Sequence, residues 1–389
     1  MTDIRRPYSS AYIVDAVRTP VGRRKGGLSH VHPVDLAAFT MNTLVERTGL
    51  DAARIDDVIL GCANQIGSQA ANIARTAWLS AGLPESVPGT TVDRRCGSSQ
   101  QAVEFAAQGI MAGVHDLVIA GGVESMSIVP IGSPTRWGEE HGAGGIYTGA
   151  GWRERYGDDP VTQFRGAEMI AEKYGIERTA MEAFALESHR RAIRAQDEGR
   201  FDQEIAAFEG VTRDEGPRPG TTLEKMATLE PLAPGGLITA ATSSQISDAS
   251  AMLLLASEDA VADHGLTPRA RIHTSAVVGS DPIMMLYGPV PATEKVLARS
   301  GLGVDDIDLF EINEAFAPVV LAWSQAIGAS LERTNVNGGA IALGHPLGAT
   351  GARLMTTLVN ELERSGGRYG LQSMCEGGGT ANATIIERV

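Results

Sequence analysis

The chain has 389 residues, of which 43% are hydrophobic and 21% charged, and its formal net charge at pH 7 is −14. This length predicts two or three globular domains, and the acidic excess argues against nucleic acid as the main partner, because phosphate contacts need a basic face. No stretch has the length and apolarity of a membrane span. The first seven residues lack an apolar signal region, so we expect no secretion.

The amino-terminal third alternates strand and helix patterns. We expect strands at residues 11–14, 57–61, 90–92 and 116–120, and helices at 33–48, 72–81 and 98–111. This alternation predicts a parallel or mixed sheet with helices on its faces.

The middle of the chain differs from the first third in composition and periodicity. Residues 128–160 are rich in glycine and aromatic residues without clear periodicity, residues 161–198 predict one long helix, and residues 214–220 are polar. Loops inserted into a rigid α/β scaffold usually carry recognition. The chain returns to the scaffold through the small residues of 239–248.

The carboxy-terminal part repeats the first plan. We expect strands at residues 306–311 and 371–375 and helices at 315–329 and 350–363. Glycine-rich corners at matching places indicate a duplicated unit.

Three cysteines, Cys62, Cys96 and Cys375, are too few and too far apart for a disulfide scaffold. We therefore expect free thiols and a reducing, cytoplasmic setting. No cysteine or histidine pair has zinc-site spacing, so no metal is expected. An anionic small ligand remains compatible with the net charge, because it needs only a local basic patch.

Cys96 lies where an extended stretch ends and a predicted helix begins. A thiol at a helix amino end feels partial positive charge, which favours the thiolate, and the following Gly-Ser-Ser allows a ligand close to the backbone. A free cysteine is often only a packing residue. The position at the amino end of an apolar helix favours the interpretation of Cys96 as a nucleophile. Cys62 has no glycine corner or basic neighbour and is interpreted as a core residue.

His345 stands between Gly344 and Pro346 at the start of another predicted helix. Pro346 suits the first helical position, and a histidine beside a helix amino end is biased toward the neutral form that a general base needs. The alternative is a structural histidine in a phosphate-binding loop. That loop lacks the spacing and the lysine of nucleotide-binding motifs, so a catalytic histidine is favoured.

Cys375 ends an apolar strand and precedes Glu376 and three glycines, whose N–H groups could hold an oxyanion. Asn313 opens the helix after the 306–311 strand, either as a cap or to orient a water. A nucleophile, a base and a second thiol are the parts that an acyl-transfer enzyme needs.

Together these motifs resemble the thiolase family over nearly the whole chain. The matching blocks are residues 96–99 (Cys-Gly-Ser-Ser), 313–316 (Asn-Glu-Ala-Phe), 344–346 (Gly-His-Pro) and 375–377 (Cys-Glu-Gly). The resemblance implies an α/β fold, a duplicated five-layer αβαβα architecture with an inserted loop domain. The first half would comprise 1–122 and 250–270, the loop domain 123–249, and the second half 271–389.

The resemblance also implies an acyltransferase that cleaves a 3-ketoacyl-CoA with CoA to acetyl-CoA and a shortened acyl-CoA, or runs the reverse condensation. Such enzymes act in fatty acid metabolism and lipid degradation. CoA and acyl-CoA would be substrates, with no permanently bound cofactor and no membrane insertion. We expect a homodimer or homotetramer.

Carried over from the family, Cys96 would become acylated, His345 would take its proton, and Cys375 would be the second acid and base. The N–H groups of Cys96 and Gly377 would form one oxyanion hole, and His345 with a water held by Asn313 the other. The residues expected to contact CoA are Arg218, Met226, Ser244 and Phe316.

Two segments depart from the family pattern. Residues 162–166 (Thr-Gln-Phe-Arg-Gly) replace a His-Met-Gly run that faces the acyl group, which leaves room for bulkier acyl chains, including ring-bearing ones. Residues 380–382 (Thr-Ala-Asn) replace the usual Met-Gly behind Cys375.

Two other functions are partly compatible with this pattern. A decarboxylating ketoacyl synthase shares the architecture, but it pairs its cysteine with two histidines or with a histidine and an asparagine, so one framed histidine with Cys375 favours a thiolase. A non-catalytic lipid-binding or scaffold protein could lose its thiols, whereas every reactive position is filled here.

Overall fold

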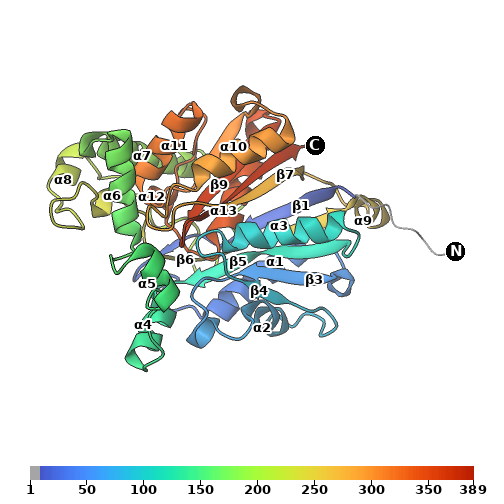
Figure 1. Cartoon of the computed structure of the whole chain (residues 1–389). Coiled ribbons are helices and arrows are strands. Elements are labelled where there is room, and N and C mark those ends of the chain that lie inside the picture. Colours follow the sequence, from blue (N-terminus) through green and yellow to red (C-terminus); the bar gives the residue numbers. More distant parts are fainter. Residues whose placement is uncertain (1–8) are drawn as a thin grey trace.

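The computed structural model describes residues 9–389, so the expectation about a signal region falls outside the described residues. Two helices within residues 128–160 were not indicated by the sequence, whereas the first half of the fold alternates strands and helices as predicted (Figure 1). Their bounds are β1 Ala11–Arg18, β2 Gly22–Arg23, α1 Pro33–Thr48, β3 Asp57–Gly61, α2 Ile73–Ser80, β4 Thr90–Val92, α3 Ser98–Met111, β5 Leu117–Ser125, α4 Ser133–Glu140, α5 Ala150–Tyr156, α6 Gln163–Tyr174, α7 Arg178–Asp197 and α8 Leu223–Ala227.

The chain then returns to the sheet, completes the first half with one strand and one helix, and builds the second half. The bounds of these elements are β6 Ser247–Ser257, α9 Glu258–Asp263, β7 Ala270–Gly279, α10 Pro289–Ser300, β8 Leu309–Ile312, α11 Ala317–Ile327, α12 Ala340–Leu343, α13 Thr350–Ser365, β9 Tyr369–Glu376 and β10 Thr380–Arg388. In the described residues no helix is long and apolar enough to cross a membrane.

The strands form a mixed sheet. Their order is β4-β3-β5-β6-β1-β7-β10-β9-β8, with β2 paired to β6. β3 runs parallel to β4 and β5, and β8 runs parallel to β9, whereas the pairs around β6 and β10 are antiparallel. The halves join where β1 meets β7 through only two residue pairs, Tyr12 with Arg271 and Ile13 with Ala270.

Helices separate and cover the two halves of the sheet. α1 and α2 share a buried cluster with the first-half strands, and α10 and α11 share another with the second-half strands. Between them, α3 and α13 lie in one cluster that includes strands of both halves, such as Leu253 of β6 and Ile386 of β10. The predicted five-layer arrangement is therefore confirmed.

The inserted helices stand to one side of the sheet (Figure 1). α6, α7 and α8 pack with α11 of the second half in a separate apolar cluster that also includes Phe316 and Cys375. The single helix predicted over residues 161–198 is wrong. Gly175, at φ 61°, ends α6 and donates its N–H to the carbonyls of Ala171 and Glu172, so α7 begins anew at Arg178.

β5 also differs from its predicted end at residue 120. It continues through Gly121 and Gly122 to Ser125, because these glycines serve close packing rather than a turn. A Cβ at Gly121 would overlap the carbonyl oxygen of Ala251, and one at Gly122 would overlap that of Gly348. The loop that follows His345 therefore lies directly against β5.

Candidate active site

Cys96 lies in the turn between β4 and α3, on the side of the first half that faces the His345 loop. The turn holds Arg95 at a φ of 50°, an uncommon conformation for a residue with a Cβ, and the Ser98 hydroxyl stabilises it by donating to the Arg95 carbonyl at 2.6 Å. Cys96 is partly exposed. Its side chain packs against a small buried cluster of Ala63, Met126 and Leu347.

The resting state of Cys96 differs from the sequence-based expectation. Although the residue as a whole is partly exposed, its sulfur is surrounded by protein atoms. This loss of solvation, and secondly the nearby Glu376 carboxyl, raise the pKa of the thiol to about 12. The helix does not compensate because α3 begins only at Ser98, with Gly97 as its cap. The expected thiolate is therefore wrong for the resting enzyme, and a neutral Cys96 needs a base to become a nucleophile.

His345 is buried and oriented by its neighbours. Its Nδ1 lies 2.7 Å from the Thr350 hydroxyl, which donates to the Pro346 carbonyl at 2.8 Å and so accepts from the ring. Nδ1 therefore carries the proton, and Nε2, 3.4 Å from Asn313 Nδ2, keeps its lone pair. Burial and the charge of Arg353 lower the pKa of His345 to about 3. The neutral form predicted for a base is present.

Hydrogen bonds to its backbone N–H groups tie this loop to β5 and to the segment that leads into β6. The His345 N–H lies 3.1 Å from both the Ser247 hydroxyl and the Gln245 carbonyl. The buried Glu124 at the end of β5 accepts the N–H of Gly348 at 2.9 Å. The loop is thus fixed by residues about 100 and 220 positions away in the chain.

Cys375 lies near the end of β9 and is fully buried. Burial first, and then the neighbouring Cys96 and Glu376, raise its pKa well above that of a free thiol. The glycine run after it forms the turn into β10, with Gly378 and Gly379 at φ 87° and 76°. The two thiols, remote in sequence, lie close enough for Cys96 to oppose the ionisation of Cys375.

Asn313 follows β8 and is 1% exposed. Its backbone N–H donates to the Ser373 carbonyl at 3.1 Å, and its Nδ2 faces His345. Its Oδ1 accepts no hydrogen bond from any described protein group. A buried acceptor left open in this way is suited to hold a water.

The four residues expected to contact CoA lie around one loop. The Ser244 N–H donates to the Ala315 carbonyl at 2.9 Å, and the preceding residue pairs with Phe316. Arg218 is exposed and donates to Gln245 Oε1 at 3.2 Å. Met226 and Phe316 are buried in the same apolar cluster as Cys375. Their proposed contacts with CoA remain predictions.

The sequence did not single out several residues that shape the site. Thr350 orients His345, Ser247 and Glu124 anchor its loop, and Glu376 lies beside Cys96. Thr350 lies five residues after the histidine, at the start of a helix. Its hydroxyl was therefore the one local signal in the sequence for a hydrogen bond to the His345 ring. The other three act through contacts that only the folded chain makes.

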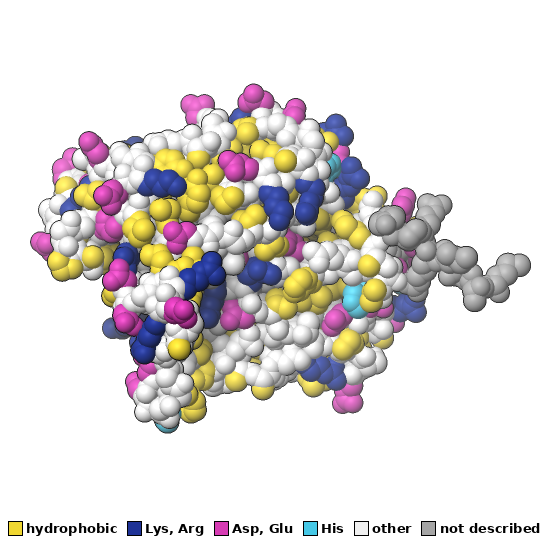
Figure 2. Space-filling model, viewed as in Figure 1, with side chains coloured by type: hydrophobic (Ala, Val, Ile, Leu, Met, Phe, Trp, Pro, Cys, Tyr) yellow, Lys and Arg dark blue, Asp and Glu magenta, His cyan; other side chains and the backbone are white. Residues whose placement is uncertain are grey.

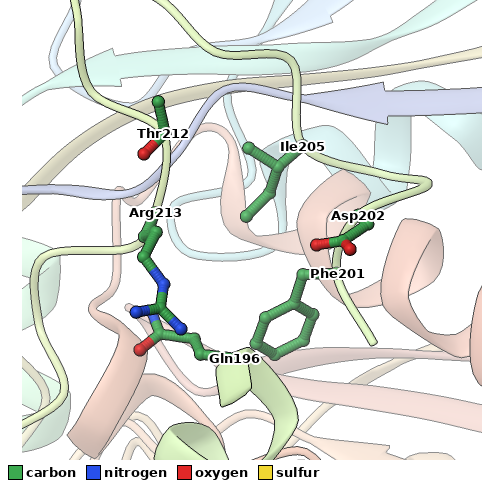
Figure 3. Close-up of a pocket in the computed structure, with 6 residues that line it drawn as sticks. All are labelled: Gln196, Phe201, Asp202, Ile205, Thr212 and Arg213. Carbon is green, nitrogen blue, oxygen red and sulfur yellow. The ribbon is translucent and has the colours of Figure 1, made fainter. Parts of the chain in front are cut away.

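A hollow elsewhere on the molecule carries no comparable chemistry. Figure 3 shows it between the end of α7 and the segments that follow, lined by Gln196, Phe201, Asp202, Ile205, Thr212 and Arg213. None of the predicted site residues lines it.

The acidic excess of the chain is not uniform over the surface, because several basic side chains lie near the middle of the face in Figure 2.

Comparisons with known proteins identify the family. The family model described as "Thiolase, N-terminal domain" matches residues 11–259, and "Thiolase, C-terminal domain" matches residues 266–388. The chain belongs to the thiolase family. It is an acyltransferase that uses CoA substrates, as the resemblance implied, and the alternatives of a ketoacyl synthase and a non-catalytic scaffold are set aside.

Individual relatives extend this result. A steroid 3-ketoacyl-CoA thiolase, FadA6, of Mycobacterium tuberculosis is 57% identical, over 98% of this chain and 95% of the relative. A beta-ketoadipyl-CoA thiolase of Pseudomonas aeruginosa is 47% identical, over 97% and 99%. The crystal structure of the Bacillus anthracis acetyl-CoA acetyltransferase matches this thiolase with a TM-score of 0.88 at 37% identity, covering 98% of this chain and all of that one.

Proposed function

We propose that this thiolase forms its acyl-enzyme on Cys96 as it cleaves a 3-ketoacyl-CoA. The observation that carries the proposal is the neutral Cys96 thiol beside the second thiol, Cys375, with the base His345 on a loop that packs against Cys96. His345 Nε2 accepts the Cys96 proton as Sγ attacks the 3-keto carbon. The C2–C3 bond then breaks, leaving an acyl thioester on Cys96 and the enolate of acetyl-CoA.

Cys375 completes both half-reactions in this proposal. Its raised pKa keeps the proton on sulfur until the enolate carbon accepts it, which releases acetyl-CoA. Cys375 then accepts the proton of an incoming CoA thiol, and that sulfur attacks the Cys96 thioester. The Cys96 sulfur leaves as the thioester breaks and takes back the proton held by His345. The products are the shortened acyl-CoA and free Cys96, so the proton count balances over the cycle.

Two sets of donors face the oxygens on which negative charge develops. The N–H groups of Cys96 and Gly377 serve the tetrahedral intermediate, and protonated His345 with a water on Asn313 serves the enolate. The open Oδ1 of Asn313 supports the water. Preorganised donors of this kind each contribute about 3 kcal/mol to transition-state stabilisation.

For the acyl group we propose chains bulkier than acetoacetyl, including ring-bearing ones. Phe164, at the start of α6, is 40% exposed and stacks edge-on against Phe316 with ring centroids 5.7 Å apart. An exposed aromatic edge beside a residue expected to line the CoA tunnel suits an apolar acyl group. The 57% identity to a steroid 3-ketoacyl-CoA thiolase favours the same class.

CoA itself is proposed to contact Ser244, Arg218, Met226 and Phe316, with Arg218 supplying the positive charge for the nucleotide phosphates. We further propose a homodimer or homotetramer and a cytoplasmic location. The location is supported by three cysteines that are all unpaired.

Two substitutions test the chemistry. Cys96→Ala should lower thiolysis by about 10³-fold or more and abolish acyl-enzyme formation detected by mass spectrometry. Cys375→Ala should block carbon–carbon cleavage while iodoacetamide still alkylates Cys96. Full thiolysis in Cys96→Ala, or equal loss of cleavage and alkylation in Cys375→Ala, would refute the assigned roles.

Steady-state thiolysis over a series of 3-ketoacyl-CoA substrates tests the acyl specificity. We expect kcat/KM to rise from acetoacetyl-CoA to long and ring-bearing acyl groups. Phe164→Ala should alter the preference among bulky substrates and leave acetoacetyl-CoA nearly unchanged. A wild-type maximum at acetoacetyl-CoA contradicts the substrate proposal without touching the assignment of Cys96.

A further inference from the structure

Glu376 is the last residue of β9 and follows Cys375 directly, yet the mechanism above does not use it. Its side chain is fully buried. It crosses to the other thiol and lies on Gly97, where an added Cβ would overlap Glu376 Oε1 and approach its Cδ to 2.7 Å. One carboxyl group therefore connects the residue after Cys375 with the residue after Cys96.

The orientation of this carboxyl is set from the next strand. β10 pairs Thr380 with Glu376, and the Thr380 hydroxyl donates to Glu376 Oε2 at 2.7 Å. Oε1, the oxygen that faces Gly97, accepts no hydrogen bond from any described protein group. Burying such an oxygen is costly, and here the open oxygen points to the segment that carries the nucleophile.

Other charged groups surround the carboxyl, and among the acids Glu376 has the largest effect on the ionisation of Cys96 and Cys375. Glu104 of α3 lies on its far side, where Asn382 and Thr384 donate to it at 2.8 and 2.9 Å. The remaining groups that act electrostatically on Glu376 or Cys96 are Arg94 and Arg95 of the turn and Glu124 of β5.

We propose that Glu376 is a positioning residue whose charge controls how readily Cys96 and Cys375 lose their protons. The proposal rests on the roles given above to the two thiols, but the ionisation that it concerns can be measured without turnover. A carboxylate at this place opposes a thiolate on either side. Once Glu376 is ionised, above about pH 8, it therefore opposes proton loss from Cys375 and from Cys96.

The sign of the effect follows from the surroundings of Glu376. Burial raises its pKa to about 8, so it is neutral at lower pH and ionised at higher pH. Because Cys96 ionises at higher pH than Glu376, its thiolate forms against a negative neighbour. A neutral side chain of the same shape should therefore let Cys96 ionise at lower pH.

The test is the rate at which iodoacetamide alkylates Cys96 between pH 6 and 10, followed on the Cys96 peptide by mass spectrometry. Glu376→Gln should raise the rate at pH 9 by about three- to tenfold, which corresponds to a shift of about 0.5 to 1 pH unit. Thr380→Val should act in the same direction but less, because without the hydroxyl the carboxyl stays protonated to higher pH. Thr380 is partly exposed, so this variant also covers the case in which Glu376→Gln fails to fold.

Glu104→Gln is the matched control, because it removes a second buried acid from the same cluster without facing a thiol. Its alkylation profile should follow that of the wild type within about 1.5-fold. Unchanged alkylation in both Glu376→Gln and Thr380→Val, or an equal increase in Glu104→Gln, would overturn the proposal. Retained thiolysis in Cys96→Ala refutes the proposed function instead, and leaves the alkylation result standing.

Discussion

The contact between His345 and Thr350 permits a sharp test of how the base is prepared. Thr350→Val keeps the shape of a buried side chain but removes the oxygen that accepts the Nδ1 proton at 2.7 Å. The buried N–H then has no partner, which costs about 1–3 kcal/mol. The imidazole avoids that cost by turning or by moving its proton to Nε2, and either change takes the lone pair away from Cys96.

At about 1.4 kcal/mol per tenfold in rate, this cost predicts a loss of about 5- to 150-fold in kcat/KM for thiolysis. Thr350→Ser keeps the hydroxyl and should stay within about threefold of the wild type. Alkylation of Cys96 by iodoacetamide, at a pH high enough to ionise the thiol, should change little in either variant. The thiolate then forms without a proton acceptor on His345. The reasoning fails if Thr350→Val retains wild-type kcat/KM, or if Thr350→Ser loses as much as Thr350→Val.

Three further outcomes are expected. Gly97→Ala places a Cβ into the Glu376 carboxyl and should lower the free energy of unfolding by about 1–3 kcal/mol, seen as a lower urea midpoint. Gly149→Ala is the control and should leave the midpoint unchanged, because Gly149 has open space around it and a φ of −66°. Equal midpoints for the two variants would contradict the packing of Glu376 on Gly97. Burial raises the pKa of Glu104 from 4.5 to about 8, so the folded state binds its proton more tightly and loses stability as pH rises from 4.5 to about 8. Glu104→Gln should flatten the dependence of Tm on pH between pH 5 and 9. Parallel Tm curves for the variant and the wild type would contradict a raised pKa of Glu104. Because the pKa of His345 is about 3, kcat/KM should show no acid limb near pH 6.5, and a limb there that vanishes in His345→Gln would disprove a neutral resting base.

Much of the architecture follows from local signals in the sequence. α1 and α3 begin and end where their patterns predict, and β3 matches its predicted range. Proline at the first position of α1 and a glycine at φ 64° after it are signals within a few residues of the helix ends. The four motif blocks likewise identify the family, because each is a contiguous run.

Other features depend on residues that the sequence separates widely. Gly121 and Gly122 signalled a strand end, yet they lie inside β5 because the backbones of β6 and the His345 loop pack on them. The prediction of a Cys96 thiolate rested on one helix end and did not include Glu376, which is 280 positions away. Burial and charge depend on neighbours in space, so the pKa of a thiol was decided only when the halves packed together. The identity of the reactive residues is written in short runs of sequence, whereas their protonation and orientation arise from contacts between distant strands and loops.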